Sequence, residues 1–179
     1  MSHIIREGKK SDCKEIRRLI QELADFEKMP NGPKITAEIL EKDCFGTDPP
    51  LCGCYVVEEA SEDQTKPDAV LIGYAIYYYS YWTWTGKTLF LEDLYISEKF
   101  RGNGLGTKLF KQIAKHAIEN KCVVMEFNVL SWNPAGSFYE SLGAVNLSKT
   151  RGVNLFRLSG EALLTFDMNK AFTFEFDDE

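Results

Sequence analysis

Residues that bind metals are scarce in this sequence. It has two histidines, His3 and His116, and no Cys-x-x-Cys pair among its five cysteines, so we expect no metal site. An odd number of scattered cysteines predicts a reduced, cytoplasmic protein in which cysteine serves as a small core residue. No apolar run reaches the roughly 20 residues of a membrane helix. The N-terminus alternates polar and apolar residues instead of opening with an apolar secretory segment, and we expect no membrane partner.

Positive charge is also in the minority. The chain has 21 lysines and arginines against 27 aspartates and glutamates, which gives a net charge of −6. Such a surface disfavours nucleic acid as a partner and mildly favours cationic small molecules. With 179 residues, 44% of them hydrophobic, the chain fits one domain with a sizeable core. Residues 58–68 are acidic and turn-rich, which is typical of an exposed loop.

Hydrophobic periodicity predicts an alternation of helices and strands. Asp12 and Glu15 resemble a capping box, and a helical stripe of apolar residues follows them. Further helices are expected at 35–45, 105–119 and 133–142. Strands are expected at 3–6, 53–58, 70–81, 88–96, 122–130 and 152–158, with a turn at Gly86–Lys87. This order predicts an α+β fold with a central mixed, mostly antiparallel sheet flanked by helices.

A glycine-rich loop lies between a predicted strand and the helix at 105–119. Its glycines at 102, 104 and 106 allow a tight turn, and amides at the helix start favour an anion such as a diphosphate. Arg101, Thr107 and Lys108 add charge and a hydroxyl group. A dinucleotide loop needs Gly-x-Gly-x-x-Gly, and a nucleotide P-loop needs Gly-Lys-Ser/Thr; residues 101–108 contain neither pattern. A tight turn with helix-packing glycines is the remaining alternative.

Four segments together resemble a known family. Arg101-x-x-Gly104-x-Gly106 resembles the acetyl-CoA diphosphate loop of the GNAT acetyltransferases. The later cofactor segment of that superfamily is similar to Trp132-Asn133 followed by residues 138–144. Residues 90–95 (FLEDLY) and 24–28 (ADFEK) resemble the diamine acetyltransferases, which comprise the spermidine/spermine N1-acetyltransferases and the thialysine N-epsilon-acetyltransferases. The resemblance runs from about residue 4 to residue 164.

This resemblance implies a GNAT fold over residues 1–166. The acidic residues 167–179 are expected to form a tail, with a short extra strand as the alternative. The resemblance also implies a homodimeric, cytoplasmic N-acetyltransferase that moves acetyl directly from acetyl-CoA to a small-molecule primary amine. Neither a metal nor an acetylated protein intermediate is expected. The implied cofactor-binding residues are Leu94, Tyr95, Ile96, Arg101, Gly102, Asn103, Gly104, Leu105, Gly106, Thr107, Asn133 and Tyr139.

Acetyl transfer to an amine sets chemical requirements that candidate side chains meet. An alkylamine has a pKa of about 10 and is mostly protonated near neutral pH, so the site needs a proton acceptor and an anchor for the cation. The resemblance assigns the first role to Glu92 and makes Asp93 a second anchor. Adjacent strand residues point to opposite faces unless a bulge intervenes. A solvated acidic pair at a strand end is the alternative.

Other roles also follow from the resemblance. Tyr139 occupies the position of the general acid that protonates the departing thiolate; the alternative is a core tyrosine beside Phe138. Phe26 and Glu27 match an aromatic and acidic pair that binds the substrate cation. Phe26 equally fits the apolar stripe of its helix. Trp84 matches a position that lines the substrate channel.

Three departures from the family pattern bear on the substrate. The segment between Asn133 and Tyr139 is one residue shorter than in the family, which weakens the assignment of Asn133. Arg151-Gly152-Val153 stands where the diamine enzymes have Glu-Gly-Trp, and Phe26-Glu27-Lys28 resembles the thialysine enzymes. These features favour an amino-acid-like amine over a long polycation. A polyamine-specific enzyme, a non-catalytic acetyl-CoA-binding protein and a dinucleotide-dependent oxidoreductase are the alternatives.

Overall fold

A computed structural model describes residues 3–59, 70–159 and 163. The chain divides into two compact units, residues 1–128 and 129–179, and each is described by itself. Most of the acidic loop predicted at 58–68 and all of the predicted tail at 167–179 lie outside the described residues.

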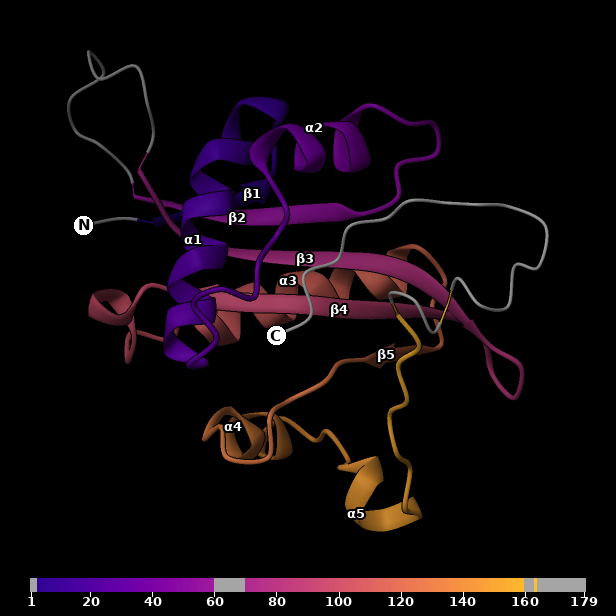
Figure 1. Cartoon of the computed structure of the whole chain (residues 1–179). Helices are drawn as coiled ribbons and strands as arrows, with labels where there is room; N and C mark the ends of the chain where they lie inside the picture. Colours follow the sequence, from indigo (N-terminus) through magenta and orange to yellow (C-terminus); the bar gives the residue numbers. More distant parts are fainter. Residues whose placement is uncertain (1–2, 60–69, 160–162, 164–179) are drawn as a thin grey trace. The chain divides into compact units, whose positions relative to one another are not determined.

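The first unit is a sheet with helices on both faces (Figure 1). Its elements are β1 (His3–Glu7), α1 (Cys13–Phe26), α2 (Ala37–Phe45), β2 (Gly53–Glu59), β3 (Leu71–Trp82), β4 (Gly86–Ile96), α3 (Leu105–Glu119) and β5 (Val124–Glu126), with short 3₁₀ turns η1 (Lys10–Asp12) and η2 (Glu98–Phe100). The strands follow the order β1-β2-β3-β4-β5. All neighbours are antiparallel except β4 and β5, which are parallel. The predicted mixed, mostly antiparallel sheet is therefore confirmed.

Two cores form because strand residues alternate between the faces of the sheet. Val56 packs with α1 and α2 on one face, and its neighbour Val57 packs with α3 on the other. The stripe predicted for α1 is confirmed, since Ile16, Leu19 and Ile20 are buried on the first face. Ile118, near the end of α3, is exposed. It lies one residue, or about 100° of helical turn, beyond the buried Ala117.

The hairpin of β3 and β4 carries a bulge. Ile76 pairs with Asp93 and Tyr77 pairs with Leu91, so Glu92 is an extra residue on β4. The turn of this hairpin lies between Trp82 and Gly86, because the Thr85 amide donates to the Trp82 carbonyl. The predicted turn at Gly86–Lys87 is thus wrong by a few residues, since both residues already belong to β4.

Asp12 does not cap α1 as a capping box requires. The Asp12 carboxylate accepts hydrogen bonds from the Lys9 amide at 2.7 Å and from the Arg6 guanidinium at 2.7 and 3.1 Å. Arg6 also donates to Glu58 at 2.6 Å, and Glu15 pairs with Arg18. The capping-box prediction for α1 is wrong, because the Asp12 carboxylate bonds to Arg6 and to the preceding Lys9 amide instead of to amides of α1. The Arg6 network instead joins β1, β2 and the turn before α1.

Two cysteines depart from the prediction of reduced thiols. Cys44, near the end of α2, and Cys52, just before β2, form a disulfide with Cα atoms 4.9 Å apart. The intervening chain folds back, since the Leu51 amide donates to the Asp43 carbonyl at 2.9 Å. This return brings the Cα atoms within the usual disulfide range. Cys13 and Cys54 are free and buried, as predicted for core residues.

The second unit contains α4 (Ala135–Ser141) and α5 (Leu147–Arg151). The helix predicted at 133–142 is confirmed, although it begins after Pro134. The strand predicted at 152–158 is wrong, because this segment has no regular structure. Asn146 caps α5 through the Lys149 amide, and Gly152 ends it with a φ of 66°. Among the described residues of this unit, no strand is present with which the segment could pair.

Candidate functional site

The bulge in β4 presents two carboxylates on one face of the sheet. Leu91 and Leu94 both pack on the α3 side, whereas Asp93 bonds to Tyr74 on the α1 side. The charge of Glu92, after burial, helps to raise the pKa of Tyr78, which stacks on Phe90. Tyr78 lies on the same face of β3 as Tyr74, since the two are four residues apart. Glu92 and Asp93 therefore share the α1 face, and only a bulge permits this.

Asp93 lies in an acidic pair with Glu27, the residue that ends α1. Burial, followed by the charge of Asp93, raises the pKa of the Glu27 carboxyl. Burial also raises the pKa of Asp93, whereas a hydrogen bond from the Tyr74 hydroxyl at 2.8 Å acts in the opposite direction. Two partly desolvated carboxylates at one place are suited to bind a cation. The structure thus brings Glu27 and Asp93 together, although they are distant in the sequence.

Phe26, Arg101 and Tyr95 form a wall beside this pair. The Arg101 guanidinium carbon lies 4.8 Å from the centre of the Phe26 ring and 5.2 Å from that of Tyr95. Its Nε donates to the Ile96 carbonyl at 2.8 Å. Phe26 is therefore not part of the buried stripe of α1; it is partly exposed and faces a cation. Arg101 is held against this wall and the end of β4.

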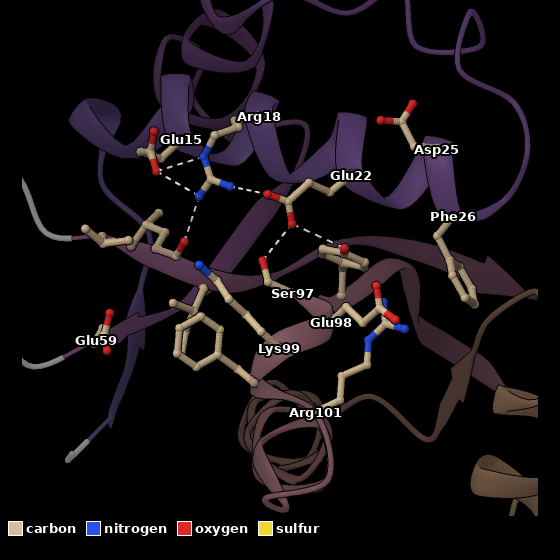
Figure 2. Close-up of a pocket in the computed structure, with 15 residues that line it drawn as sticks. Glu15, Arg18, Glu22, Asp25, Phe26, Glu59, Ser97, Glu98, Lys99 and Arg101 are labelled. Atoms are coloured by element: carbon tan, nitrogen blue, oxygen red, sulfur yellow. Dashed lines mark hydrogen bonds and ion pairs between the residues drawn. The ribbon is translucent and has the colours of Figure 1, made fainter.

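A cavity of about 890 Å³ opens along this wall (Figure 2). Glu22 from α1 lies across it and accepts hydrogen bonds from Ser97 at 2.7 Å and Tyr95 at 3.2 Å. Arg18 pairs with Glu22 and donates to the Leu71 carbonyl at 2.8 Å. The remaining lining residues are Glu15, Asp25, Phe26, Glu59, Val70, Ile72, Glu98, Lys99, Phe100 and Arg101. The cavity thus has an apolar floor and a charged rim, and it continues from the Phe26 wall.

The glycine loop has the backbone that an anion site needs. Gly102 and Gly104 have φ angles of 82° and 74°, which favour glycine, and Gly104 is the N-cap of α3. The first bond of α3 runs from the Lys108 amide to the Gly104 carbonyl at 3.0 Å. The amides of residues 105–107 therefore precede the first helical donor and have no acceptor within the helix. A Cβ at either residue, or at Gly106, would meet no atom within 4 Å, so the cradle is open. These features fit the diphosphate of acetyl-CoA.

The outer edge of β4 offers a second element for a cofactor. β5 pairs with β4 only at Thr88, Leu89 and Phe90 and, within the described part of the chain, continues no further. The strand predicted at 122–130 is correspondingly reduced to Val124–Glu126. Leu94, Tyr95 and Ile96 lie beyond the end of this pairing and are bonded to β3 on their other side. Their outer backbone groups therefore face the place where β5 diverges from β4.

Trp84 lies apart from these groups. It is 80% exposed in the turn between β3 and β4 and stacks on Trp82 at 5.6 Å. Seven residues of β4 separate this turn from Asp93, a distance of about 20 Å along the strand. Within the first unit, the structure therefore does not bring Trp84 to the acidic pair.

The second unit holds the two remaining candidates. Tyr139 lies on α4 with its ring 5.0 Å from that of Phe138, in an edge-on arrangement. The Asn133 side chain accepts a hydrogen bond from the Ala135 amide at 2.9 Å. Asn133 thus stabilises the start of α4. Arg151 and Val153, which replace the Glu and Trp of the family motif, are exposed around the end of α5.

Comparisons with known proteins identify the family. Residues 3–144 match the acetyltransferase (GNAT) family. The chain belongs to this family. Thialysine N-epsilon-acetyltransferase of Bos taurus is 40% identical over 161 residues, which cover 89% of this chain and 94% of that protein. Spermidine/spermine N(1)-acetyltransferase-like protein 1 of Homo sapiens is 43% identical over 162 residues, which cover 89% of this chain but 23% of that longer protein.

Solved structures agree on the fold. AAC(6')-Iy, in complex with the bisubstrate analogue CoA-S-monomethyl-acetylneamine, superposes with a TM-score of 0.68 at 18% identity, covering 88% of this chain and 98% of that one. The predicted GNAT fold and the predicted class of enzyme, an N-acetyltransferase, are confirmed. Within residues 3–59 and 70–159, no helix is both long and apolar enough to cross a membrane.

Two features of the site were not predicted from the sequence: the Tyr74 hydroxyl and the contact of Glu22 with Ser97. Tyr74 lies within a run of aromatic residues, and nothing in that run distinguishes the one that bonds Asp93. The Glu22–Ser97 contact joins residues 75 positions apart, so local patterns carry no signal for it. Glu22 also lies three residues before Asp25 and on a charged helix face, which is typical of a solvated surface.

Proposed function

We propose that the chain transfers acetyl from acetyl-CoA to the primary amine of a lysine-like amino acid or a diamine. The observation that carries this proposal is the acidic pair of Glu27 and Asp93 beside the Phe26 ring. Carboxylates bind an ammonium by charge, and an aromatic face adds a cation–π contact. The names of the relatives, which specify thialysine and spermidine or spermine, support a small cationic amine.

Backbone groups are proposed to hold the co-substrate. The amides of residues 102–107 would bind the diphosphate at the start of α3, and the outer edge of Leu94–Ile96 would bind the pantetheine arm. When bound, acetyl-CoA supplies an acyl group activated as a thioester. The bound analogue in AAC(6')-Iy supports the fit of a CoA ligand to this fold. None of the proposed steps requires a metal ion, because backbone amides are proposed to bind the negative charge of the diphosphate.

The acidic residues are proposed to bind and deprotonate the amine. Glu27 and Asp93 anchor the cation, and Glu92 at the bulge removes one ammonium proton, directly or through water. The neutral nitrogen then forms a bond to the acyl carbon while the carbon–sulfur bond breaks. Tyr139 is the proposed donor of a proton to the departing thiolate. The acylated nitrogen then loses its second proton, which restores the Tyr139 phenol through water. The Glu92 proton passes to solvent, so protons and charge balance in direct transfer.

The proposed preference among amines depends on positively charged residues near the acidic pair and in the family motif. Lys28 follows Glu27 directly, and Arg151 occupies the position of a family glutamate. Extra cations favour a substrate that carries a carboxylate, as an amino acid does. A polyamine is the second candidate, favoured by the 43% identity to the spermidine/spermine-like protein. We therefore expect kcat/KM for thialysine and lysine to exceed that for putrescine and spermidine.

Release of free thiol tests the proposal. Purified protein is mixed with acetyl-CoA and each of the four amines, and CoA thiol is followed with a chromogenic disulfide reagent. Turnover with at least one amine, and saturation by it, is expected. Tight binding of acetyl-CoA without turnover of any amine would instead support a non-catalytic acetyl-CoA-binding protein. Stabilisation by NAD but not by CoA would support the oxidoreductase.

The homodimer and the cytoplasmic location are also proposed here. Members of this family resemble the chain over most of its length, and the exposed apolar residues at 153–158 are compatible with a partner surface. Light scattering after gel filtration measures the mass in solution, and a monomer of one chain would contradict the dimer. Fractionation of cells that express the protein tests its location.

A further inference from the structure

The hydroxyl group of Tyr74 has a single charged partner among the described contacts. Tyr74 lies on β3 with its side chain fully buried in the core under α1. It pairs with Tyr95 across the hairpin, and the two ring centres are 6.3 Å apart. Its hydroxyl donates to Asp93 Oδ2 at 2.8 Å. A core position of this kind suits phenylalanine unless the hydroxyl is needed, since burying it without a partner costs free energy.

The Glu27–Asp93 pair has an electrostatic problem that this hydroxyl addresses. Burial and the proximity of two carboxylates both favour a neutral carboxylic acid. A neutral acid does not attract an ammonium ion. A donated hydrogen bond stabilises the ionised carboxylate and also fixes the direction of its second oxygen.

The charged and titratable groups around Asp93 come from three elements. Glu27 faces it from α1, Tyr74 faces it from β3, and Glu92 and Tyr95 are its neighbours on β4. Arg101 stacks on Tyr95 and bonds the Ile96 carbonyl, so this cation is committed to the wall of the site. Of these groups, Tyr74 donates the hydrogen bond described above to Asp93.

We propose that Tyr74 is a positioning residue that keeps the Asp93 carboxylate ionised and turned toward the acceptor amine. The proposal rests on the proposed function, in which Glu27 and Asp93 bind the amine. Tyr74 itself is buried and does not touch substrate. Its effect passes through the hydrogen bond alone.

The substitution Tyr74→Phe removes the hydroxyl and keeps the ring. We expect the acidic limb of kcat/KM against pH to move upward by about one unit. At a pH below that limb, kcat/KM then falls about tenfold, through KM for the amine and not through kcat. Tyr55→Phe is the matched control: this buried tyrosine also bonds a carboxylate, Glu7, but on the α3 face. The acidic limb of the Tyr55→Phe profile should lie at the same pH as that of the wild type.

A second measurement separates this proposal from the proposed function. Carbon NMR of protein labelled at the aspartate carboxyls follows the titration of Asp93 without any turnover, and Asp93→Asn assigns the resonance. We expect Tyr74→Phe to raise the titration midpoint of Asp93. An unchanged midpoint in a folded variant overturns the role of Tyr74, whereas a wild type inactive with every amine overturns the proposed function alone. In the Asp93→Asn background, Tyr74→Phe should no longer alter the pH profile.

Discussion

Glu92 and Asp93 have different environments, although the bulge in β4 turns both toward the same face of the sheet. Asp93 is half-buried and held by Tyr74 beside the α1 core, whereas Glu92 is exposed although it points to the same face. An exposed carboxylate keeps access to water, which a proton acceptor needs, and a half-buried one is better suited to hold a cation. We therefore propose that Asp93 binds the amine and Glu92 removes its proton.

Glu92→Gln tests this division at the residue scale. The amide cannot accept the ammonium proton, so turnover should need a higher pH, at which part of the amine is already neutral. We expect kcat near neutral pH to fall by about 10²-fold or more, with partial recovery above pH 9. A pH–rate profile of kcat measures the effect. Loss of amine binding with kcat unchanged would instead make Glu92 an anchor like Asp93.

Tyr139→Phe tests the second proton transfer. Removing the phenol leaves the thiolate without its donor, so kcat should fall by about 10²–10⁴-fold while acetyl-CoA affinity changes little. Steady-state kinetics and calorimetry of acetyl-CoA binding measure the two quantities. Phe138→Leu is the control, since it removes the ring that Tyr139 contacts but not the hydroxyl. Equal losses in both variants would indicate a packing role.

At the scale of elements, the start of α3 combines a left-handed backbone with open space. The positive φ angles at Gly102 and Gly104 favour glycine, whereas Gly106 lies in the first turn of the helix. No atom lies within 4 Å of a Cβ built at Gly106. Alanine there is compatible with the fold and occupies the space into which a diphosphate would approach.

Gly106→Ala should therefore separate stability from binding. We expect the free energy of unfolding to stay level or rise by up to about 1 kcal/mol, because alanine is the better helix former. The Kd for acetyl-CoA should rise by about tenfold or more, as measured by calorimetry. Gly136→Ala, which also has open space in a helix, is the control and should leave Kd unchanged. Unchanged acetyl-CoA binding by Gly106→Ala would contradict the diphosphate site.

The disulfide between Cys44 and Cys52 joins the end of α2 to the start of β2. Closing this short loop stabilises the fold by about 2.5 kcal/mol in the chain-entropy model. In denaturant without reductant, three thiols should react with iodoacetamide, and all five should react after reduction. Mass spectrometry counts the labels. Reductant should lower the Tm of the wild type but not that of Cys44→Ser, and five labels without reductant would rule the disulfide out.

At the scale of the whole molecule, a polar cluster joins α3 to the sheet on the face opposite Asp93. His116 contacts the Tyr55 hydroxyl through Nδ1 at 3.2 Å and the Tyr79 hydroxyl through Nε2 at 2.9 Å. Burial lowers the pKa of His116 below its ordinary value. The folded state therefore prefers the neutral ring, and the unfolded chain takes up a proton first as the pH falls.

Stability should follow from this preference. A depressed pKa in the folded state means that the His116 contribution is complete above about pH 6.5 and is lost as the pH falls through the folded pKa. We expect Tm to decrease between pH 7.5 and pH 5.5, and His116→Gln to flatten that decrease. His3→Gln is the control with the same number of histidines. Parallel curves for the wild type and His116→Gln would exclude His116 as the source.

Features set by the local pattern of apolar residues could be predicted from the sequence, and features set by other contacts could not. Local periodicity was sufficient for α1, α3 and the hairpin of β3 and β4, since each buries a regular set of apolar residues. The failures have other causes: Asp12 bonds Arg6 instead of capping α1, and residues 152–158 have no described strand to join. Whether Glu92 would share a face with Asp93 depended on a bulge, which pattern alone does not fix. The roles of the site residues stay predictions.

The single extra residue at Glu92 also makes β4 tolerant of a particular deletion. Removing Glu92 would place Leu91 next to Asp93, opposite Tyr77 and Ile76 as before, and would leave every apolar residue of the strand on its own side. Most one-residue deletions in a strand move every side chain beyond the deletion to the opposite face of the sheet. Without Glu92 the pairing of β3 with β4 is unchanged, so the shortened chain would keep its fold and Asp93, the proposed cation anchor, and would lose only the proposed proton acceptor.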